Sequence, residues 1–384
     1  MKDVRVLHLA SFEGNIGDNA NHNGVHELWR TCLPGYRFHF HQLEMREFYW
    51  KMRAFDRDFA SLANTYDLLV IGGGNYFELW VEHSPTGTSV AIPPEIMGMI
   101  RTPTLFYALG LDPYMGAPEV CVERFKGFLD MVLASERCLV SVRNDGSKQS
   151  ARTVLGDAYA DRLHMMPDGG FFVRPGSHYH PELQDDCRTI GVNLAGDMPD
   201  FRFGGQDGSG VRRFLDDLTS VLADSLTRNP DLNLVLYPHI WKDFSLISEF
   251  CQRFPDPLLR RRTTVAPYLH GPGAERYIFD TYARCALNMG NRFHTNVCSI
   301  GLNVPSIGFV THPQIRELYR EVNLPDRCLA TADPDFAGNL AGLLDASLKD
   351  LPGLRKRYEA SMVMVRGQAT AFLGTVGAWL ETVL

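Results

Sequence analysis

The chain has 384 residues, of which 45% are hydrophobic and 22% are charged, and its formal net charge is −7. This composition is typical of a globular protein and excludes a chain that is mostly disordered. The acidic balance argues against a protein that binds the phosphate backbone of nucleic acids, although it leaves room for a small cationic site for one anion.

The cysteines and the apolar segments indicate the compartment. The eight cysteines are scattered and form no C-x-x-C pair, which favours free thiols in a reducing cytosol over a disulfide framework or a zinc ribbon. Arg5, His8 and Glu13 interrupt the N-terminal apolar run, so we expect no signal peptide. No stretch approaches the roughly 18 uninterrupted apolar residues of a membrane span. We therefore expect a cytoplasmic protein.

In the first half of the chain, short apolar runs alternate with amphipathic segments, as in parallel sheets covered by helices. We expect strands over residues 4–10, 37–43, 67–73, 104–111, 138–144 and 163–170. Helical periodicity predicts helices over residues 47–66 and 119–137.

A stretch rich in Pro, Gly and His, residues 174–188, interrupts this alternation and predicts a domain boundary. Beyond it we expect strands over residues 189–197, 232–239, 262–269, 285–291 and 304–309, and helices over 210–229, 336–348 and 357–384. The chain thus predicts an α/β fold with two doubly wound Rossmann-like domains, residues 1–175 and 188–384, the second with a helical tail. We expect these domains to face each other across a cleft, with the ligand beyond the carboxyl ends of the strands.

Two glycine-rich turns follow expected strands. In GNIGDNA, residues 14–20, two glycines three positions apart permit a tight turn, and Asp18 and Asn19 can cap the next helix. A helix N-terminus of this kind favours an anion or a polar substrate, but an ordinary capped turn shows the same pattern. The glycines at 72–74 indicate positive φ angles or the close approach of either a ligand or a helix.

Charged residues follow two other expected strands. Arg143 could offer its planar guanidinium to a carboxylate or phosphate, with Asp145 orienting it, or the two could form a structural salt bridge. His239 has Asp243 within reach on the next turn, and a carboxylate beside an imidazole would raise its pKa and suit a general acid. A histidine in this position can equally serve only to hydrogen-bond a backbone group.

Arg292 and His294 lie in an otherwise apolar stretch, MGNRFHTNVCSIGLNVPSIGF. Residues two apart in an extended strand point to the same side, so we expect both side chains to project together. Thr295 would then open a helix whose N-terminal amides face the same ligand. Because no Asp or Glu stands between positions 280 and 317, we expect Arg292 to lack a local carboxylate, and the pair predicts a site for an anion.

In this order, the stretches resemble the motifs of the polysaccharide pyruvyl transferase family over most of the chain. The matching elements are G-N-x-G-D at 14–18, G-G-G at 72–74, S-V-R-N-D-G-S at 141–147, P-D-G-G-F-F at 167–172, P-H at 238–239 with Asp243, and R-F-H at 292–294 with Gly301 and P-S-I at 305–307. The chain departs from the family pattern at Asn144, where an acidic residue is usual, and at Gln314, near which a lysine is common.

The resemblance implies a GT-B-like fold and a transferase that moves pyruvate from phosphoenolpyruvate to a sugar as a cyclic ketal, with release of phosphate, in the synthesis of a surface polysaccharide. It implies phosphoenolpyruvate as the donor substrate and a saccharide or lipid-linked saccharide as the acceptor. It calls for no cofactor, no metal and no nucleic acid. Peripheral membrane association and the oligomeric state stay open.

The chemistry of this reaction assigns roles to the residues at the expected strand ends. Two anionic groups of the donor require arginines, protonation of its methylene requires an acid, and the departing phosphate requires hydrogen-bond donors. The expected catalytic residues are Arg292, His239 and His294. The expected donor-binding residues are Arg143, Asn193, Arg292, His294 and Thr295. The expected acceptor or cleft-lining residues are Asn15, Asp18, Gly73, Gly74, Asn75 and Asp145.

Three alternatives compete with this hypothesis. One is a glycosyltransferase that uses a nucleotide sugar on the same two-domain frame, although the lack of a carboxylate between positions 280 and 317 argues against it. Another is a non-catalytic relative that binds a sugar or an anion. In the third, the arginines and histidines only tie the two domains together.

Overall fold

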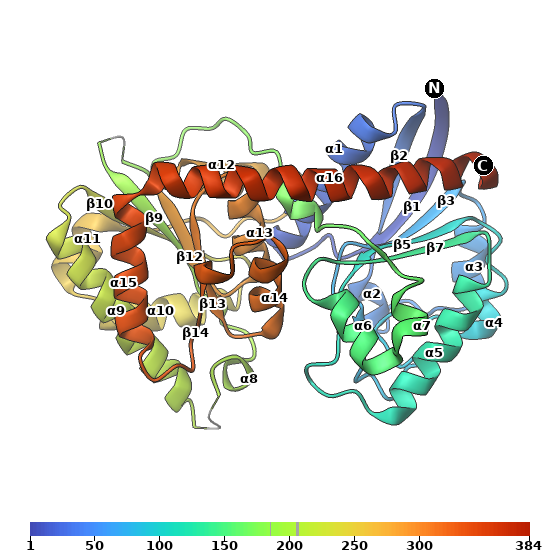
Figure 1. The fold of residues 1–384 in the computed structure, drawn as a ribbon, viewed down its shortest axis with the longest axis horizontal. Coiled ribbons are helices and arrows are strands. Elements are labelled where there is room, and N and C mark those ends of the chain that lie inside the picture. The colour runs from blue at the N-terminus through green and yellow to red at the C-terminus, as the bar shows by residue number, and fades with distance from the viewer. Residues whose placement is uncertain (185, 205–206) are drawn as a thin grey trace. The chain divides into compact units, whose positions relative to one another are not determined.

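The computed structural model describes residues 1–184, 186–204 and 207–384, and the chain divides into two compact units. Unit 1 comprises Met1–Glu13, Val25–Gly169 and Val365–Leu384, and unit 2 comprises Gly14–Gly24 and Gly170–Met364. Each unit is a parallel sheet covered by helices (Figure 1). The expected domain bounds, 1–175 and 188–384, stay a prediction, and residue 185 of the expected boundary stretch lies outside the described residues.

The sheet of unit 1 has six parallel strands in the order β2-β1-β3-β5-β7-β8. These strands are β1 (Lys2–Ala10), β2 (Tyr36–Glu44), β3 (Leu68–Gly72), β5 (Thr104–Leu109), β7 (Cys138–Val142) and β8 (His164–Met165). A separate pair joins β4 (Phe77–Glu78) to β6 (Leu111–Asp112). Every residue of β3 and β5 is buried because helices cover both faces of the sheet.

The helices around this sheet include α2 (Arg46–Tyr49), α3 (Arg57–Ala63), α4 (Pro94–Met97), α5 (Glu119–Leu133), α6 (Ser147–Leu155) and α7 (Asp157–Ala160). The helix predicted over residues 47–66 is wrong, since the chain forms two short helices there. Lys51 takes a positive φ of 58°, which ends the first one. The Asp56 carboxylate accepts hydrogen bonds from the amides of Asp58 and Phe59 and so starts the second.

The sheet of unit 2 also has six parallel strands, in the order β11-β10-β9-β12-β13-β14. They are β9 (Arg188–Asn193), β10 (Leu232–Tyr237), β11 (Thr263–Val265), β12 (Leu287–Gly290), β13 (Ser306–Val310) and β14 (Cys328–Ala330). In chain order this is the 3-2-1-4-5-6 arrangement of Rossmann folds, and its direction reverses between β9 and β12. A ligand site is expected beyond the carboxyl ends of these two strands.

Helices cover both faces of this sheet, and alternate residues of β10 face opposite cores. Leu234 and Leu236 belong to one core cluster, and Val235 and Tyr237 belong to another. The first core packs against α9 (Ser209–Arg228), α10 (Asp243–Arg253) and α15 (Phe336–Lys349). The second packs against α12 (Ala274–Arg284), α13 (Phe293–Gly301) and the first turns of α1 (Ile16–Cys32).

The remaining elements are α8 (Pro199–Phe203), α11 (Asp256–Arg262), α14 (Pro313–Glu321), α16 (Leu351–Val383) and two 3₁₀ turns, η1 (Gly169–Phe172) and η2 (Pro325–Arg327). The expected strands are all present, and so are the expected helices other than the one over 47–66. The predicted fold class, α/β with two doubly wound Rossmann-like units, is confirmed.

Candidate functional site

The switch point of the unit 2 sheet brings together the loops that follow three strands. Gly290 of β12 lies beside Asn193 of β9 in the strand register. The buried Asn193 amide donates to the backbone oxygen of Tyr237, 2.8 Å away, and accepts from the Arg292 amide at 3.2 Å. The nitrogen and the oxygen of this side chain therefore both bind backbone groups, so Asn193 positions the loops around the switch point.

Arg292 has carboxylate partners, contrary to the expectation from the sequence. Its Nε and Nη2 donate to the two oxygens of Asp243 at 2.8 and 2.5 Å, and Nη2 also lies 2.6 Å from Asp197. These acids are distant along the chain and reach Arg292 because β9 and β10 end beside β12. Within the described residues Nη1 makes no hydrogen bond, so this nitrogen is the one that a ligand can use.

The expected strand-end geometry of Arg292 and His294 is also wrong. Arg292 is the N-cap of α13, in an extended conformation, and the helix begins at Phe293. His294 therefore lies in the first turn of a helix, where the alternation of a strand does not apply. Thr295 lies in the same turn, two residues after the start of the helix that we expected it to open. The first backbone amides of a helix lack intrahelical acceptors, which favours an anion at this end.

The GNIGD segment lies against this helix, within unit 2. The amide of Ile16 donates to the backbone oxygen of His239 at 3.2 Å, and the Asn15 side chain accepts from the Gly17 amide at 3.0 Å. Asp18 Oδ1 lies 3.8 Å from His294 Nδ1. The structure thus places Asn15 and Asp18, which we expected on the acceptor side, beside the residues expected to bind the donor.

His239 is buried, and its ring hydrogen-bonds a tyrosine hydroxyl instead of the expected carboxylate. Its Nε2 lies 2.8 Å from the hydroxyl of Tyr282, which lies 3.2 Å from the hydroxyl of Thr295. Asp243 accepts from the backbone amide of His239 at 2.8 Å. In the described part of the chain, the buried Nδ1 of His239 has no hydrogen-bond partner.

The environment of His239 corrects the expected effect of Asp243. Burial, followed by the charges of Arg292 and His294, holds the pKa of His239 well below its ordinary value of 6.5. The imidazole is therefore neutral near pH 7 and suits a hydrogen-bonding or proton-accepting role.

In unit 1, the glycines at 72–74 are explained first by packing. A Cβ on Gly72 would lie 2.0 Å from the backbone oxygen of Tyr107, in the neighbouring strand, and one on Gly74 would meet the ring of Tyr76 at 2.3 Å. Gly73 has a positive φ of 84°, a conformation that favours glycine. Gly72 thus packs against a neighbouring strand and Gly74 against an aromatic ring, and not against the ligand or the helix that the sequence left open.

Arg143 forms a buried ion cluster in the same unit. Its Nε and Nη2 donate to Asp145 Oδ2 at 2.9 and 2.7 Å, and its Nη1 lies 3.3 Å from Asp168. The hydroxyl of Ser147 donates to Asp145. Asn75 donates to Asp112 at 3.1 Å, and its side chain, like that of Arg143, would crowd a Cβ at Gly110. All three guanidinium nitrogens of Arg143 thus contact carboxylates.

Asn144, which departs from the family pattern, accepts a hydrogen bond from the Asp168 amide at 3.0 Å. An amide oxygen fills this acceptor role as well as a carboxylate does, and it adds no further negative charge beside Asp145 and Asp168. The departure is therefore compatible with the same local backbone.

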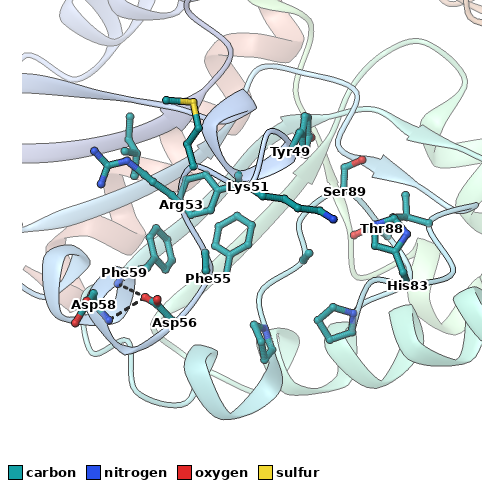
Figure 2. Close-up of a pocket in the computed structure, with 18 of the residues that line it drawn as sticks. Tyr49, Lys51, Arg53, Phe55, Asp56, Asp58, Phe59, His83, Thr88 and Ser89 are labelled. Atoms are coloured by element: carbon teal, nitrogen blue, oxygen red, sulfur yellow. Dashed lines mark hydrogen bonds between the residues drawn. The ribbon is translucent and has the colours of Figure 1, made fainter.

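A pocket of about 1140 Å³ opens in unit 1, lined by Leu43 near the end of β2, by the segment 48–62 and by residues between 81 and 93 (Figure 2). Its lining combines aromatic rings with hydroxyls, and includes Phe48, Tyr49, Phe55, Phe59, Thr88 and Ser89. Figure 2 shows Lys51 extending toward the wall that carries Thr88 and Ser89. The sequence did not reveal this pocket because the aromatic run from 48 to 59 has helical periodicity.

Other residues of the candidate sites were also missed. Asp197 follows β9 and binds Arg292, and Tyr282 on α12 connects His239 to Thr295. Glu78 on β4 accepts a hydrogen bond from Ser89, which lines the pocket. A lone acid in the apolar run NYFELW was the available signal for Glu78.

Comparisons with known proteins agree on family and fold. A model of the polysaccharide pyruvyl transferase family matches residues 15–313. The structure is similar to that of MnaA from S. aureus with UDP (TM-score 0.54, 10% identity, 94% of this chain and 91% of that chain covered). It is also similar to a UDP-GlcNAc 2-epimerase from Neisseria meningitidis with UDP-GlcNAc (TM-score 0.51, 10% identity, 94% and 98% covered). These likenesses confirm the GT-B-like fold class.

A comparison with curated proteins finds no significant match. In the described ranges, no helix is both long enough and apolar enough to cross a membrane.

Proposed function

The chain belongs to the polysaccharide pyruvyl transferase family, and from this membership we propose that it transfers pyruvate from phosphoenolpyruvate to a sugar as a cyclic ketal, in the synthesis of a surface polysaccharide. One observation carries the proposal. The GNIGD segment, His239 and the Arg292–His294 turn come together in unit 2, at the switch point of a doubly wound sheet.

The donor carries a carboxylate and a phosphate, and this site offers it cationic and amide groups. Nη1 of Arg292 donates to one anionic group, while Asp243 and Asp197 hold the rest of the guanidinium in place. The first-turn amides of α13, including that of Thr295, favour negative charge at the same end. Asn193 acts by positioning Arg292. Arg143 is left out of the donor site because its nitrogens contact Asp145 and Asp168.

Transfer begins with a proton on the donor's methylene carbon, which makes the neighbouring carbon electrophilic. His294, whose Nδ1 lies 3.8 Å from Asp18 Oδ1, supplies this proton. One sugar hydroxyl adds to the electrophilic carbon and loses its proton. Phosphate then leaves with the C–O bond pair, and the second hydroxyl closes the ketal. His239, neutral and hydrogen-bonded to Tyr282, is the acid/base partner that accepts a proton.

We assign the acceptor to the pocket in unit 1. Phe48 and Phe55 stack on each other with ring centroids 4.1 Å apart, and the outer faces of such rings suit the C–H faces of sugar rings. The hydroxyls of Thr88 and Ser89 offer hydrogen bonds. Phe55→Leu, which keeps an apolar side chain without the ring, should raise the KM for the acceptor and leave the KM for phosphoenolpyruvate unchanged. An unchanged acceptor KM would remove the pocket from the proposal.

The eight cysteines are all free in the described chain. Free thiols support the proposal that the protein works in the reducing cytoplasm.

The decisive experiment incubates the protein with phosphoenolpyruvate and a panel of free and lipid-linked saccharides. Mass spectrometry should detect the mass of a pyruvate ketal on one acceptor, and free phosphate should rise in equal amount. Thermal shifts with phosphoenolpyruvate and with nucleotide sugars distinguish the alternatives. Stabilisation by a nucleotide sugar alone would favour a glycosyltransferase. Stabilisation by phosphoenolpyruvate without phosphate release from any acceptor would favour a non-catalytic relative.

A further inference from the structure

A second cluster of chemically active side chains lies elsewhere in unit 2. His178 and His180 belong to the segment between η1 and β9, and Asp280 belongs to α12. One ligand atom from each of the three residues lies within 4.8 Å of the other two. The sequence did not indicate this cluster because Asp280 is far from the two histidines along the chain.

The spacing of these atoms suits a small divalent ion. His180 Nε2 lies 2.8 Å from Asp280 Oδ2, and His178 Nδ1 lies 3.7 Å from the same oxygen. Bonds of about 2.0–2.2 Å in a tetrahedral site place neighbouring ligand atoms roughly 3.3–3.6 Å apart. Small side-chain shifts convert the observed spacing into that geometry. We propose that His178, His180 and Asp280 bind a divalent transition-metal ion of the Zn²⁺ class.

The surroundings of His180 strengthen this assignment. Its Nδ1 lies 3.4 Å from Glu182 Oε1, and the hydroxyl of Tyr277 donates to the other oxygen of Glu182 at 3.1 Å. A metal-binding histidine commonly donates its second ring N–H to a carboxylate, which fixes the tautomer and aims the other nitrogen at the metal. Glu182 occupies that outer position here.

Two of the three proposed ligands are buried, and the third is partly exposed to solvent. The side chain of His180 is fully buried and that of Asp280 is 8% exposed, whereas His178 is 43% exposed. Two ligands are thus fixed in the fold, and the third closes the site from the solvent side, where water supplies the fourth position.

Asp280 Oδ2 also accepts a hydrogen bond from the backbone amide of His178 at 2.8 Å. Arg284 is the charged side chain that competes with the metal for this oxygen. Its Nη2 lies 3.2 Å from Asp280 Oδ2 and 2.9 Å from the backbone oxygen of His178. Its side chain is 44% exposed, so it can turn into solvent when an ion takes its place. The bound ion would tie the segment before β9 to α12.

The test uses the full chain, stripped with a chelator and titrated with Zn²⁺ by calorimetry. The protein should bind one equivalent and melt at a higher temperature with Zn²⁺ present. His178→Ala should weaken Zn²⁺ binding at least about tenfold, and Glu182→Gln, which removes the outer carboxylate, by about tenfold or more. His270→Ala removes another exposed histidine of unit 2. This control variant should keep both the wild-type affinity for Zn²⁺ and the wild-type rise in melting temperature with Zn²⁺.

Co²⁺ gives a second readout that is independent of any transferase activity. The wild-type protein should develop the visible absorption bands of a tetrahedral Co²⁺ site, and His178→Ala should lose them while keeping its melting temperature in the chelated state. If the wild type takes up no Zn²⁺, or if His178→Ala binds as tightly as His270→Ala, the assignment is wrong.

Discussion

The backbone of Gly17 lies directly against the imidazole of His294. A Cβ built on Gly17 would come within 2.7 Å of both the Cβ and the Nδ1 of His294. Gly17 belongs to the GNIGD segment and His294 to the first turn of α13, so two distant parts of the sequence meet at one contact. The side chain proposed to protonate the donor therefore occupies its place only because residue 17 has no side chain.

Gly17→Ala should displace the His294 ring, since the methyl group and the imidazole cannot share this space. We expect phosphate release from phosphoenolpyruvate, measured with the accepted sugar, to fall at least about tenfold because proton transfer depends on geometry. Gly342→Ala is the matched control: it makes the same change on a helix of unit 2, where a Cβ meets open space. Equal activity of the two variants would show that the position of His294 does not matter for the reaction, and would contradict its proposed role as the proton donor.

Arg292→Lys tests the donor site with the charge kept. A lysine is a point charge and cannot bridge Asp243 and Asp197 while also donating to a ligand, so we expect kcat/KM for phosphoenolpyruvate to fall by about a hundredfold or more. Arg292→Ala should abolish turnover, but it also leaves two carboxylates without a cation, at a cost of about 3–5 kcal/mol of folding stability.

Unfolding by urea, followed alongside the kinetics, keeps these two effects apart. A lysine variant that folds normally and turns over at nearly the wild-type rate would show that Arg292 is a structural partner of Asp243 and nothing more.

The sequence was a good guide wherever local patterns decide the structure. The buried strands appear as apolar runs, and the polar turns after them lie at the carboxyl ends of the strands, where ligands bind in such sheets. The segment over 47–66 is the exception, because the positive φ of Lys51 and the Asp56 cap interrupt a pattern that is helical throughout.

Partners that come from distant segments could not be predicted in the same way. The expectation that Arg292 lacks a carboxylate rested on neighbours along the chain, while Asp197 and Asp243 reach it through the order of the strands. Likewise, the expected pKa of His239 assumed that Asp243 faces its ring. The carboxylate instead accepts from backbone, and burial sets the direction of the shift.

His239 should make stability depend on acid pH. Its pKa is depressed in the folded state, so the unfolded chain binds the proton more readily below pH 6.5. The contribution is fully present above that pH and is lost as the pH falls, at up to about 1.4 kcal/mol per pH unit for one proton. His239→Gln cannot titrate and can still bond Tyr282. Its free energy of unfolding should therefore decline less than that of the wild type between about pH 7 and about pH 5; parallel curves would rule out His239 as the source.

Glu78 should make the free energy of unfolding fall as the pH rises, which is the opposite of the effect of His239. Burial raises its pKa from 4.5 to about 7, with Ser89 opposing and Asp112 adding to the shift. A raised carboxyl pKa means that stability is present at acid pH and is lost as the pH rises from about 4.5 through about 7. Glu78→Gln removes the buried charge and can still accept from Ser89, so at pH 8 its free energy of unfolding should exceed that of the wild type by up to about 3 kcal/mol.

Urea titrations of Glu78→Gln at low and high pH give this comparison directly. Glu136→Gln serves as the control because it makes the same change on an exposed residue of unit 1. The gain should vanish for Glu78→Gln at pH values well below 4.5, where Glu78 is protonated in both states. A variant that is no more stable than the wild type at pH 8, or a gain of the same size at every pH, would show that Glu78 is not held in its neutral form by burial.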